Sequence, residues 1–473
     1  MMTSILSGEF EIGMSQTKRP IADTILIALT LLLLVLLPLL LETSRDREWG
    51  YGLFVTFVAL LTGGWAFTQA ARERASTNRA WPFALPMIGL LCLTQIWVGA
   101  QLYLGITADP GVSVRMLGIG IAYTLLFTLI CGLFHTRKRL TLLITVLIAS
   151  ATLQAFYGTL MTLSGIEWKL VSEKEIYRGV ATGTFYNRNH LAGYLEMALG
   201  LGIGLLLAMR DNRAFKWRHL FELIMGPKAR LRLALVIMVI ALVMTRSRMG
   251  NTGFFVSLIV VGGLYVLLNK ENRKRNILIL VSIVVIDVLV ISQYFGLDQL
   301  KDRLVNTRFV DQTEVVVSET GEETVRTLGA NEIRDDINVY AWPQFLEKPI
   351  TGFGAGTFES TFQKYPGPDV KLKFDHAHND YMEFAIEYGI IGLIPLTAFV
   401  LFSLYMALKA LWNRNSWYRS GIGFGSSMGI IAILVHATTE FNFQIPANAA
   451  TFITLCAIAV LANTHTKTKQ TRA

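Results

Sequence analysis

Long apolar segments constrain this chain more than any other feature. Runs of roughly 20 apolar residues recur from residue 22 to residue 463, and a helix of that length crosses a hydrocarbon core of about 30 Å. Such unbroken runs differ from the alternating pattern of a membrane β-barrel. We therefore predict an all-α polytopic membrane protein with about 12 transmembrane helices, at 22–41, 50–71, 81–104, 115–134, 139–165, 189–209, 231–245, 252–268, 277–295, 381–409, 421–437 and 447–463.

The composition agrees with this class of protein. Of the 473 residues, 53% are hydrophobic and 16% are charged, and the mean hydropathy is +0.47, far from the average of soluble domains. The first apolar run is too long for a signal-peptide core and lacks a good cleavage site, so we expect it to remain as a helix. The three cysteines fall inside apolar runs and are expected to be core residues, without a disulfide or a metal: Cys92, Cys131 and Cys456.

Lysine and arginine are distributed unevenly between the two sets of loops. If both termini are cytoplasmic, the inner segments include Arg137-Lys138-Arg139 and the basic run at 270–275, whereas the outer loops 105–114 and 438–446 contain neither residue type. Positive charge is typical of cytoplasmic loops. The net charge of +9 therefore indicates orientation and attraction to anionic membrane lipid, not a nucleic-acid partner.

The predicted helices divide the chain into five segments. Two groups of transmembrane helices are separated by one large outer loop, and short cytoplasmic ends flank them. The segments are the N-terminus at 1–21, helices one to nine at 22–295, the loop at 296–380, helices ten to twelve at 381–463 and the tail at 464–473.

The large outer loop contains three recognisable parts. Residues 311–331 are acidic and Thr-rich and are expected to form a hairpin or a mobile tip. Residues 332–348 have helical apolar spacing, which predicts an amphipathic helix on the membrane surface. Residues 352–356, Gly-Phe-Gly-Ala-Gly, are expected to form a flexible turn, because no strand–turn–helix context supports a phosphate-binding loop.

Several arginines lie on the outer side, where the positive-inside rule disfavours them. Arg246 and Arg248 follow the seventh predicted helix, and Arg178 and Arg188 precede the sixth, which begins at Asn189. A guanidinium group offers planar donors that match phosphate oxygens, so this set could bind a diphosphate. The alternative is that each arginine reaches toward lipid headgroups.

A polar stretch closes the large outer loop. Residues 375–380, Asp-His-Ala-His-Asn-Asp, run directly into the tenth predicted helix. Imidazole suits proton transfer near neutral pH, which makes His376 and His378, with Asn379 and Asp380, candidate site residues. The alternative is a polar cap on a membrane helix, and the residues of the stretch alone favour neither interpretation.

Four motifs on the outer side resemble those of the O-antigen ligase and polymerase superfamily. The resemblance covers roughly Arg178 to Pro395 and rests on the order of the motifs and on their common side of the membrane. The motifs are Gly-Thr-Phe-Tyr-Asn-Arg-Asn-His-Leu-Ala at 183–192, Ser247-Arg248, Pro-Ile-Thr-Gly-Phe-Gly-Ala-Gly-Thr-Phe at 349–358, and His378-Asn379-Asp380-Tyr381 followed by Glu-Tyr-Gly-Ile-Ile-Gly at 387–392.

The resemblance implies a GT-C-like membrane glycosyltransferase that works without a metal or another cofactor. Members of the superfamily take a glycan from undecaprenyl diphosphate on the periplasmic face of the inner membrane. Ligases pass it to a lipid A-core sugar or, in some relatives, to a protein, and polymerases pass it to the next lipid-linked repeat unit. Our first expectation is a ligase, and a polysaccharide polymerase is the alternative.

The motif match also implies roles for individual residues. His378 falls at the superfamily's essential histidine and Arg248 at its essential arginine, so both are the expected catalytic residues. Arg178 or Arg188 would fill a further arginine role before helix six, and the match does not decide between them. Substrate binding is expected of Arg178, Arg188, Asn189, Arg246, His376, Asn379 and Asp380.

The expected mechanism assigns a proton transfer to His378. Its neutral imidazole would accept the proton of the attacking acceptor hydroxyl, and the arginines would stabilise the charge of the departing diphosphate. Asp375 or Asp380 could orient an imidazole, whereas His376 would point elsewhere in an extended segment. A His-x-His zinc site is the competing interpretation of the pair, and it lacks an evident third ligand.

Other polar residues keep alternatives open. Asp287, inside the ninth predicted helix, is either functional or paired with a neighbouring helix. Glu196, Glu383 and Glu387 pose the same choice nearer the outer face, where His436 and Glu440 are expected simply to line the surface. A transporter or flippase of lipid-linked glycan is the competing class of protein, but no internal repeat is evident and the arginines and histidines gather at one surface.

Overall fold

The computed structural model describes most of the chain between Ile21 and Thr466. The residues it describes are 21–41, 48–71, 78–170, 172–174, 176–209, 226–268, 273–274, 276–278, 280–282, 285, 313–317, 323–327, 332–366 and 374–466.

Ten helices in these ranges are long and apolar enough to cross a membrane. The chain is therefore an all-α polytopic membrane protein, as predicted. The ten are α1 (Ile21–Leu41), α2 (Glu48–Ala70), α3 (Trp81–Tyr103), α4 (Pro110–Leu133), α5 (Arg137–Ser164), α6 (Arg188–Ala208), α9 (Arg248–Leu268), α14 (Asp380–Leu411), α15 (Trp417–His436) and α16 (Pro446–Thr464).

The other two predicted helices are not among these ten. The run at 231–245 does form a helix, α8 (Pro227–Met244), but its first turns carry the basic residues Lys228, Arg230 and Arg232. The run at 277–295 lies largely outside the described residues, as does Asp287.

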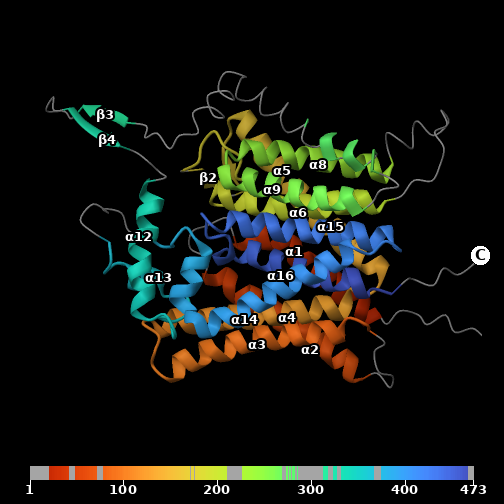
Figure 1. Ribbon diagram of the computed structural model, residues 1–473, viewed down its shortest axis with the longest axis horizontal. Coiled ribbons are helices and arrows are strands. Elements are labelled where there is room, and N and C mark those ends of the chain that lie inside the picture. Colours follow the sequence, from red (N-terminus) through yellow and green to blue (C-terminus); the bar gives the residue numbers. More distant parts are fainter. Residues whose placement is uncertain are drawn as a thin grey trace, which may run out of the picture.

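The long helices stack side by side, and the smaller elements gather at one end of the stack (Figure 1). We call this the loop end; the end of α16 lies toward the opposite end. The starts of α6, α9, α14 and α16 all lie at the loop end, as do the small elements β1 (Trp168–Lys169), β2 (Ser172–Glu173), β3 (Thr313–Val317), β4 (Glu323–Thr327), α12 (Glu332–Glu347), α13 (Phe358–Phe362) and η3 (Asn442–Gln444).

Two predictions for the large outer loop are confirmed. Strands β3 and β4 pair antiparallel, with Thr313 opposite Thr327, and so form the hairpin expected at 311–331. Helix α12 occupies the segment expected to be helical and lies across the end of the stack of long helices (Figure 1). Ile337 and Ala341 on one face of α12 are fully buried against Phe353 and Phe358. The predicted position of α12 on the membrane surface stays a prediction.

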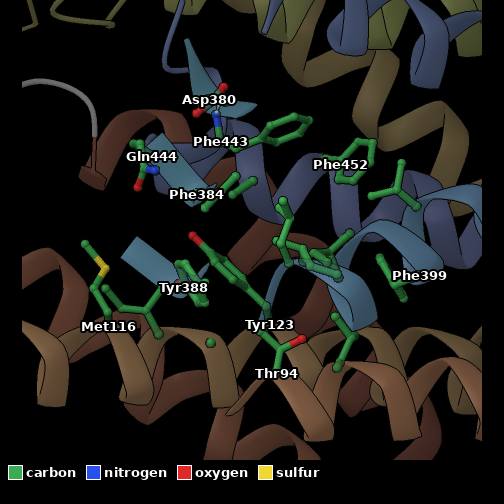
Figure 2. Close-up of a pocket in the computed structure, with 18 of the residues that line it drawn as sticks. Thr94, Met116, Tyr123, Asp380, Phe384, Tyr388, Phe399, Phe443, Gln444 and Phe452 are labelled. Carbon is green, nitrogen blue, oxygen red and sulfur yellow. Dashed lines mark hydrogen bonds between the residues drawn. The ribbon is translucent and has the colours of Figure 1, made fainter. Parts of the chain in front are cut away.

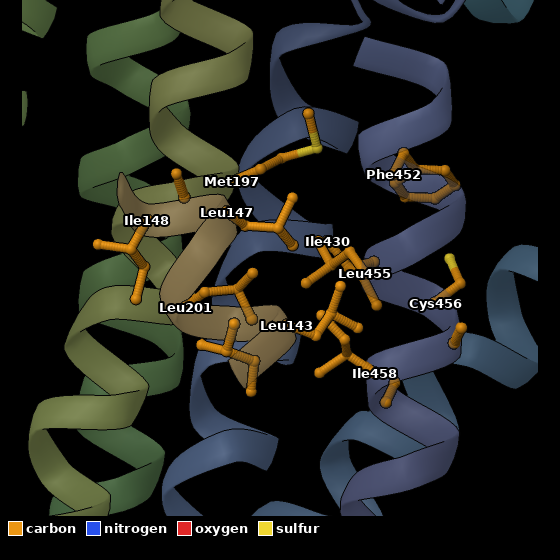
Figure 3. Close-up of a cluster of buried hydrophobic side chains, with 14 of the residues drawn as sticks. Leu143, Leu147, Ile148, Met197, Leu201, Ile430, Phe452, Leu455, Cys456 and Ile458 are labelled. Atoms are coloured by element: carbon orange, nitrogen blue, oxygen red, sulfur yellow. The ribbon is translucent and has the colours of Figure 1, made fainter. Parts of the chain in front are cut away.

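Helix α6 forms the centre of the molecule and is buried along its entire length. Its glycines allow α15 to approach closely, because a Cβ on Gly204 would lie 2.4 Å from the carbonyl oxygen of Gly421 and one on Gly200 would lie 2.8 Å from the amide of Gly429. Small residues permit such backbone approach between membrane helices. Apolar side chains of α5, α6, α15 and α16 fill the space around this contact (Figure 3).

Helix α14 is interrupted at Gly389, whose φ of 60° and ψ of −178° are not helical. The glycine-rich turn at 352–356 packs into this break. The amides of Phe353 and Gly354 donate to the carbonyls of Ile386 and Glu387, at 2.9 and 3.0 Å. The predicted turn is thus present, but it is held by hydrogen bonds to α14 rather than left flexible.

Helix α3 supplies further donors to the same break. The side-chain amide of Gln101 donates to the carbonyls of Thr351 (2.7 Å) and Glu387 (2.9 Å), and the indole of Trp97 donates to Tyr388 (2.7 Å). Carbonyls freed by the interrupted helix would be costly to leave unpaired in an apolar environment. The break is therefore a built feature that fixes the end of the large loop against α14.

Candidate functional site

Three histidines surround the ring of Phe441 at the loop end. His376 stacks on the ring with centroids 4.2 Å apart, and His190 and His378 meet it edge to face at 4.8 and 4.9 Å. These residues come from the start of α6, from the end of the large loop and from the connection between α15 and α16. The phenyl ring thus joins three segments that are distant in sequence.

His378 faces a carboxylate from the connection after α15. Its Nδ1 lies 3.5 Å from Oε2 of Glu440, which is almost fully buried, while the His378 side chain retains 22% of its exposure. The other oxygen of Glu440 accepts a hydrogen bond from the side-chain amide of Asn189 at the start of α6. Asn189 therefore holds the carboxylate of Glu440 beside the imidazole of His378, which remains accessible.

His376 has a different carboxylate. Its Nδ1 lies 2.7 Å from Oε1 of Glu383, whose other oxygen accepts from the backbone amide of Ala377 at 2.8 Å. The expectation that His376 points away from His378 is wrong, because both rings contact Phe441. The physical reason is the left-handed backbone of His378, with φ at 48°, which removes the side-chain alternation of an extended segment.

Asn379 and Asp380 have structural roles at the start of α14. The side-chain oxygen of Asn379 accepts from the amides of Tyr381 and Met382, at 3.1 and 3.2 Å, and so caps the helix. Oδ2 of the buried Asp380 accepts from the amide of Phe443 at 3.0 Å. The polar stretch is consequently both a helix cap and the carrier of the two histidines. The carboxylate that faces His378 is Glu440, while Asp380 holds the segment of η3.

Arg246 and Arg248 lie on the surface of the loop end, at the start of α9, and both are exposed. The guanidinium group of Arg248 has no ion-pair partner among the residues that the structure describes. Two residues further along α9, a Cβ on Gly250 would come within 3.3 Å of Cε1 of His436 at the end of α15. Arg248 therefore belongs to the same end of the bundle as the histidines.

Arg178 and Arg188 occupy different surroundings. Arg178 is largely exposed and lies 3.4 Å from the carboxylate of Glu173, in strand β2. Arg188 is half-buried at the first position of α6, next to Asn189, and its guanidinium carbon lies 5.6 Å from the ring centroid of Tyr177. Of the two, Arg188 is the one attached directly to the residue that holds Glu440.

A buried lysine stiffens the loop that carries both arginines. Nζ of Lys174 lies 2.7 Å from the carboxylate of Glu167 and donates to the carbonyl of Val180 at 3.0 Å. The same carboxyl group accepts from the amide of Gly179 at 2.7 Å. These contacts join the start of the segment between α5 and α6 to the residues around Arg178.

A third histidine–carboxylate pair lies beneath the site. Nδ1 of His436 is 3.1 Å from Oε1 of Glu196, and both side chains are fully buried between α6 and α15. A Cβ on Gly253 of α9 would lie 3.0 Å from Oε2 of Glu196. His436 was expected to line the outer face; it is instead an internal partner that joins three membrane helices.

An apolar groove opens beside the histidines, between α14 and the pair α3 and α4. Figure 2 shows Asp380 beside Phe443 and Gln444 at one edge, with Tyr123 and Thr94 on the opposite wall. The groove follows α14 from Asp380 to Phe399, 20 residues that correspond to roughly 28 Å of helix. Most of its lining side chains are apolar or aromatic.

The arrangement brings together most of the residues selected from the sequence. His376, His378, Asn189, Asn379 and Asp380 lie around Phe441 and Glu440. Arg188 and Arg248 begin the neighbouring helices α6 and α9, whereas Arg178 lies beside Glu173 of strand β2. Chemically, the loop end offers an accessible imidazole that faces a buried carboxylate, cationic donors, and an adjoining apolar groove.

Sequence reasoning missed the contacts of Glu440 and Phe441. Glu440 was expected simply to line the outer face, and Phe441 was not singled out. The contact between Glu440 and Asn189 joins residues that are 251 positions apart, so local sequence patterns do not reveal it.

Comparison with known proteins gives one family and one relative. The family model described as O-antigen ligase matches residues 233–397, a range that contains Arg248 and His378 but not Arg178, Arg188 or Asn189. An uncharacterized protein of Haemophilus influenzae is 28% identical over 185 residues, which cover 37% of this chain and 44% of that protein. The match thus spans less than half of the relative. The resemblance predicted from the motifs is confirmed for residues 233–397, where this polytopic membrane protein matches the O-antigen ligase family model.

Proposed function

We propose that this protein transfers a glycan from undecaprenyl diphosphate to an acceptor hydroxyl on the periplasmic face of the inner membrane, in the manner of an O-antigen ligase. The family match supports a role in glycan transfer at a membrane. The observation that carries the proposal is the accessible imidazole of His378, which faces the buried carboxylate of Glu440 at the loop end of the bundle.

The reaction requires one proton acceptor and one site for a leaving anion. The acceptor oxygen attacks the anomeric carbon of the donor sugar, and the bond between that carbon and the diphosphate oxygen breaks. The hydroxyl proton passes to the imidazole of His378, and the electron pair of the broken bond leaves on undecaprenyl diphosphate. Glu440 orients the imidazole and stabilises the imidazolium that forms.

Arginines would stabilise the leaving diphosphate without a metal. Arg248 is exposed at the start of α9 and has no ion-pair partner among the described residues, so its guanidinium group is available to a phosphate. Arg188 begins α6 beside Asn189, which holds Glu440. Donors placed before the reaction stabilise charge that grows in the transition state.

The apolar groove supports a lipid-linked substrate. It begins at Asp380, two residues after His378, and continues along α14 to Phe399. A polyprenyl chain in this groove would exchange lipid contacts for protein contacts while its head remains at the loop end. The same reasoning applies to a donor and to a lipid-linked acceptor, so the groove agrees with a ligase and with a polymerase.

Glycolipid profiles of cells that lack the protein test the proposal and separate the two alternatives. Complementation should use the wild type, His378→Ala, and His135→Ala as a control at the opposite end of the bundle. Loss of long chains from lipid A-core, with intact polymer on the carrier lipid, indicates a ligase; single repeat units indicate a polymerase. We expect His378→Ala to match the deletion and His135→Ala to match the wild type. A normal profile in the deletion strain would contradict glycan transfer.

A further inference from the structure

A cationic cavity lies at the end of the bundle opposite to the proposed site. It has a volume of about 610 Å³ and is bounded by the start of α1 and the first turns of α5. Three consecutive basic residues line it, Arg137, Lys138 and Arg139, together with three threonine hydroxyls from the two helices. Neither the proposed reaction nor the family match uses this cavity.

Only one of the three cations is neutralised. Arg139 lies 3.1 Å from the carboxylate of Asp23. Arg137 stacks on the ring of Tyr418, with its guanidinium carbon 4.3 Å from the ring centroid, and Lys138 is exposed. In the part of the chain that the structure describes, neither Arg137 nor Lys138 has an acidic partner. Three positive charges against one negative charge leave a net charge of two, which favours an anion.

An apolar stripe continues from the cavity along α5. Leu142 lines the cavity and is 44% exposed, and Leu153, Phe156 and Leu160 are exposed on the same face about three to five turns further along. Helix α1 packs against α5 and presents Ile25, Leu29 and Leu32, which are likewise exposed. A ligand with an anionic head and apolar chains therefore finds complementary surfaces for both parts.

We propose that this cavity binds the phosphate headgroup of an anionic phospholipid, with its acyl chains along the exposed faces of α1 and α5. Arg137 and Lys138 donate to the phosphate oxygens, and Thr24 adds a polar side chain to the lining of the cavity. The apolar stripe distinguishes a phospholipid from free phosphate, because free phosphate cannot use it.

The site also explains how bound lipid would stabilise the fold. Arg137 lies over the ring of Tyr418 in α15, and the hydroxyl oxygens of Tyr418 and Thr141 are 2.7 Å apart. The chain after α16 pairs with the same corner, where Thr466 accepts from the amide of Arg137 at 3.1 Å. A lipid held by Arg137 would thus connect α1, α5, α15 and the end of α16.

Thermal unfolding of the full-length protein in mixed micelles tests the proposal. Phosphatidylglycerol should raise the Tm of the wild type in a saturable way, and phosphatidylcholine or inorganic phosphate should not. Arg137→Gln/Lys138→Gln should weaken the apparent affinity for phosphatidylglycerol about 25-fold, at roughly fivefold for each cation near an anionic headgroup. Lys138→Gln alone keeps the Arg137–Tyr418 contact and should fold normally. We expect it to weaken the apparent affinity for phosphatidylglycerol about fivefold.

The matched control removes two basic residues elsewhere at the same end. Arg273 and Lys274 are both exposed and lie outside the cavity, so Arg273→Gln/Lys274→Gln should retain the wild-type response. An equal loss in this control would mean that overall surface charge, and not the cavity, attracts the lipid. A full response of the Arg137/Lys138 variant, or an equal response to inorganic phosphate, would also overturn the assignment.

Discussion

At the scale of single residues, the account rests on the pair His378 and Glu440. Glu440 is almost fully buried, and its second oxygen is held by Asn189. A carboxylate held in this way acts through the imidazole, as a positioning residue, and does not need to touch a substrate. Its removal should therefore alter turnover and leave substrate binding intact.

Glu440→Gln tests this division of roles. Glutamine can still accept from Asn189 but carries no negative charge, so we expect kcat to fall by roughly tenfold with KM unchanged, less than the ~10²–10⁴-fold contribution of a general base. Steady-state kinetics on the purified protein provide the measurement. Glu383→Gln, which alters the partner of His376 instead, serves as the control. A rise in KM at constant kcat would mean that Glu440 acts in binding.

The two arginines before α6 can now be separated by experiment. Arg188 begins α6 beside Asn189, while Arg178 pairs with the exposed Glu173 of strand β2. We expect Arg188→Lys to lower kcat by roughly a hundredfold, because lysine keeps the charge but loses the planar pair of donors. The kcat of Arg178→Lys should stay within about twofold of the wild-type value. A larger loss of kcat in Arg178→Lys than in Arg188→Lys would instead place the diphosphate near Arg178 and strand β2.

Much of the site could be predicted from residue type and spacing, and its connections could not. His378 stands out because imidazole suits proton transfer near neutral pH, and Arg248 because the positive-inside rule disfavours arginine in outer segments. Glu440 does not, since its role depends on Asn189, 251 residues earlier in the chain. The contact of His376 with Phe441 was also missed, because it follows from the left-handed backbone of His378 and not from alternation.

At the scale of elements, the break in α14 positions the large loop relative to the site. The sequence shows one apolar run across this point, and the run predicts a continuous helix. The structure instead interrupts the helix at Gly389 and fills the break with donors from the glycine-rich turn and from Gln101. Helix periodicity contains no information on donors supplied by another helix, which is why the interruption was not foreseen.

Gly389→Ala tests the importance of the break. A Cβ at Gly389 would lie 2.3 Å from the carbonyl oxygen of Ile350, and the residue has a positive φ. We expect a loss of stability of about 2 kcal/mol or more, from backbone strain and this clash. Gly263→Ala in α9 is the control, since a Cβ there meets no atom within 4 Å, and it should be neutral or slightly stabilising. Equal Tm values for the two variants would show that the break tolerates a side chain.

At the scale of the whole molecule, alternating helix directions separate two functional ends. The histidines around Phe441 and the arginines Arg188 and Arg248 lie at the loop end, and the cationic cavity and the end of α16 lie at the other. The uneven distribution of basic residues predicts which end is cytoplasmic, and this orientation follows from sequence alone. The number of helices was also largely predictable, because each long apolar run is a local property.

Cysteine labelling in intact cells tests the orientation. In a variant that lacks the three native cysteines, Tyr103→Cys at the loop end should react with a membrane-impermeant maleimide added from outside, because Tyr103 is 91% exposed. Asn415→Cys, exposed in the connection between α14 and α15, should react only after the inner membrane is permeabilised. Reaction of Asn415→Cys alone in intact cells would invert the proposed topology.

The most direct test of the central claim is transfer by the purified full-length protein with a lipid-linked glycan donor and a lipid A-core acceptor. We predict that the wild type forms the glycosylated acceptor, and that His378→Ala forms it at least ~10²-fold more slowly at an unchanged Tm. Transfer by His378→Ala at the wild-type rate would contradict the assignment of His378 as the proton acceptor.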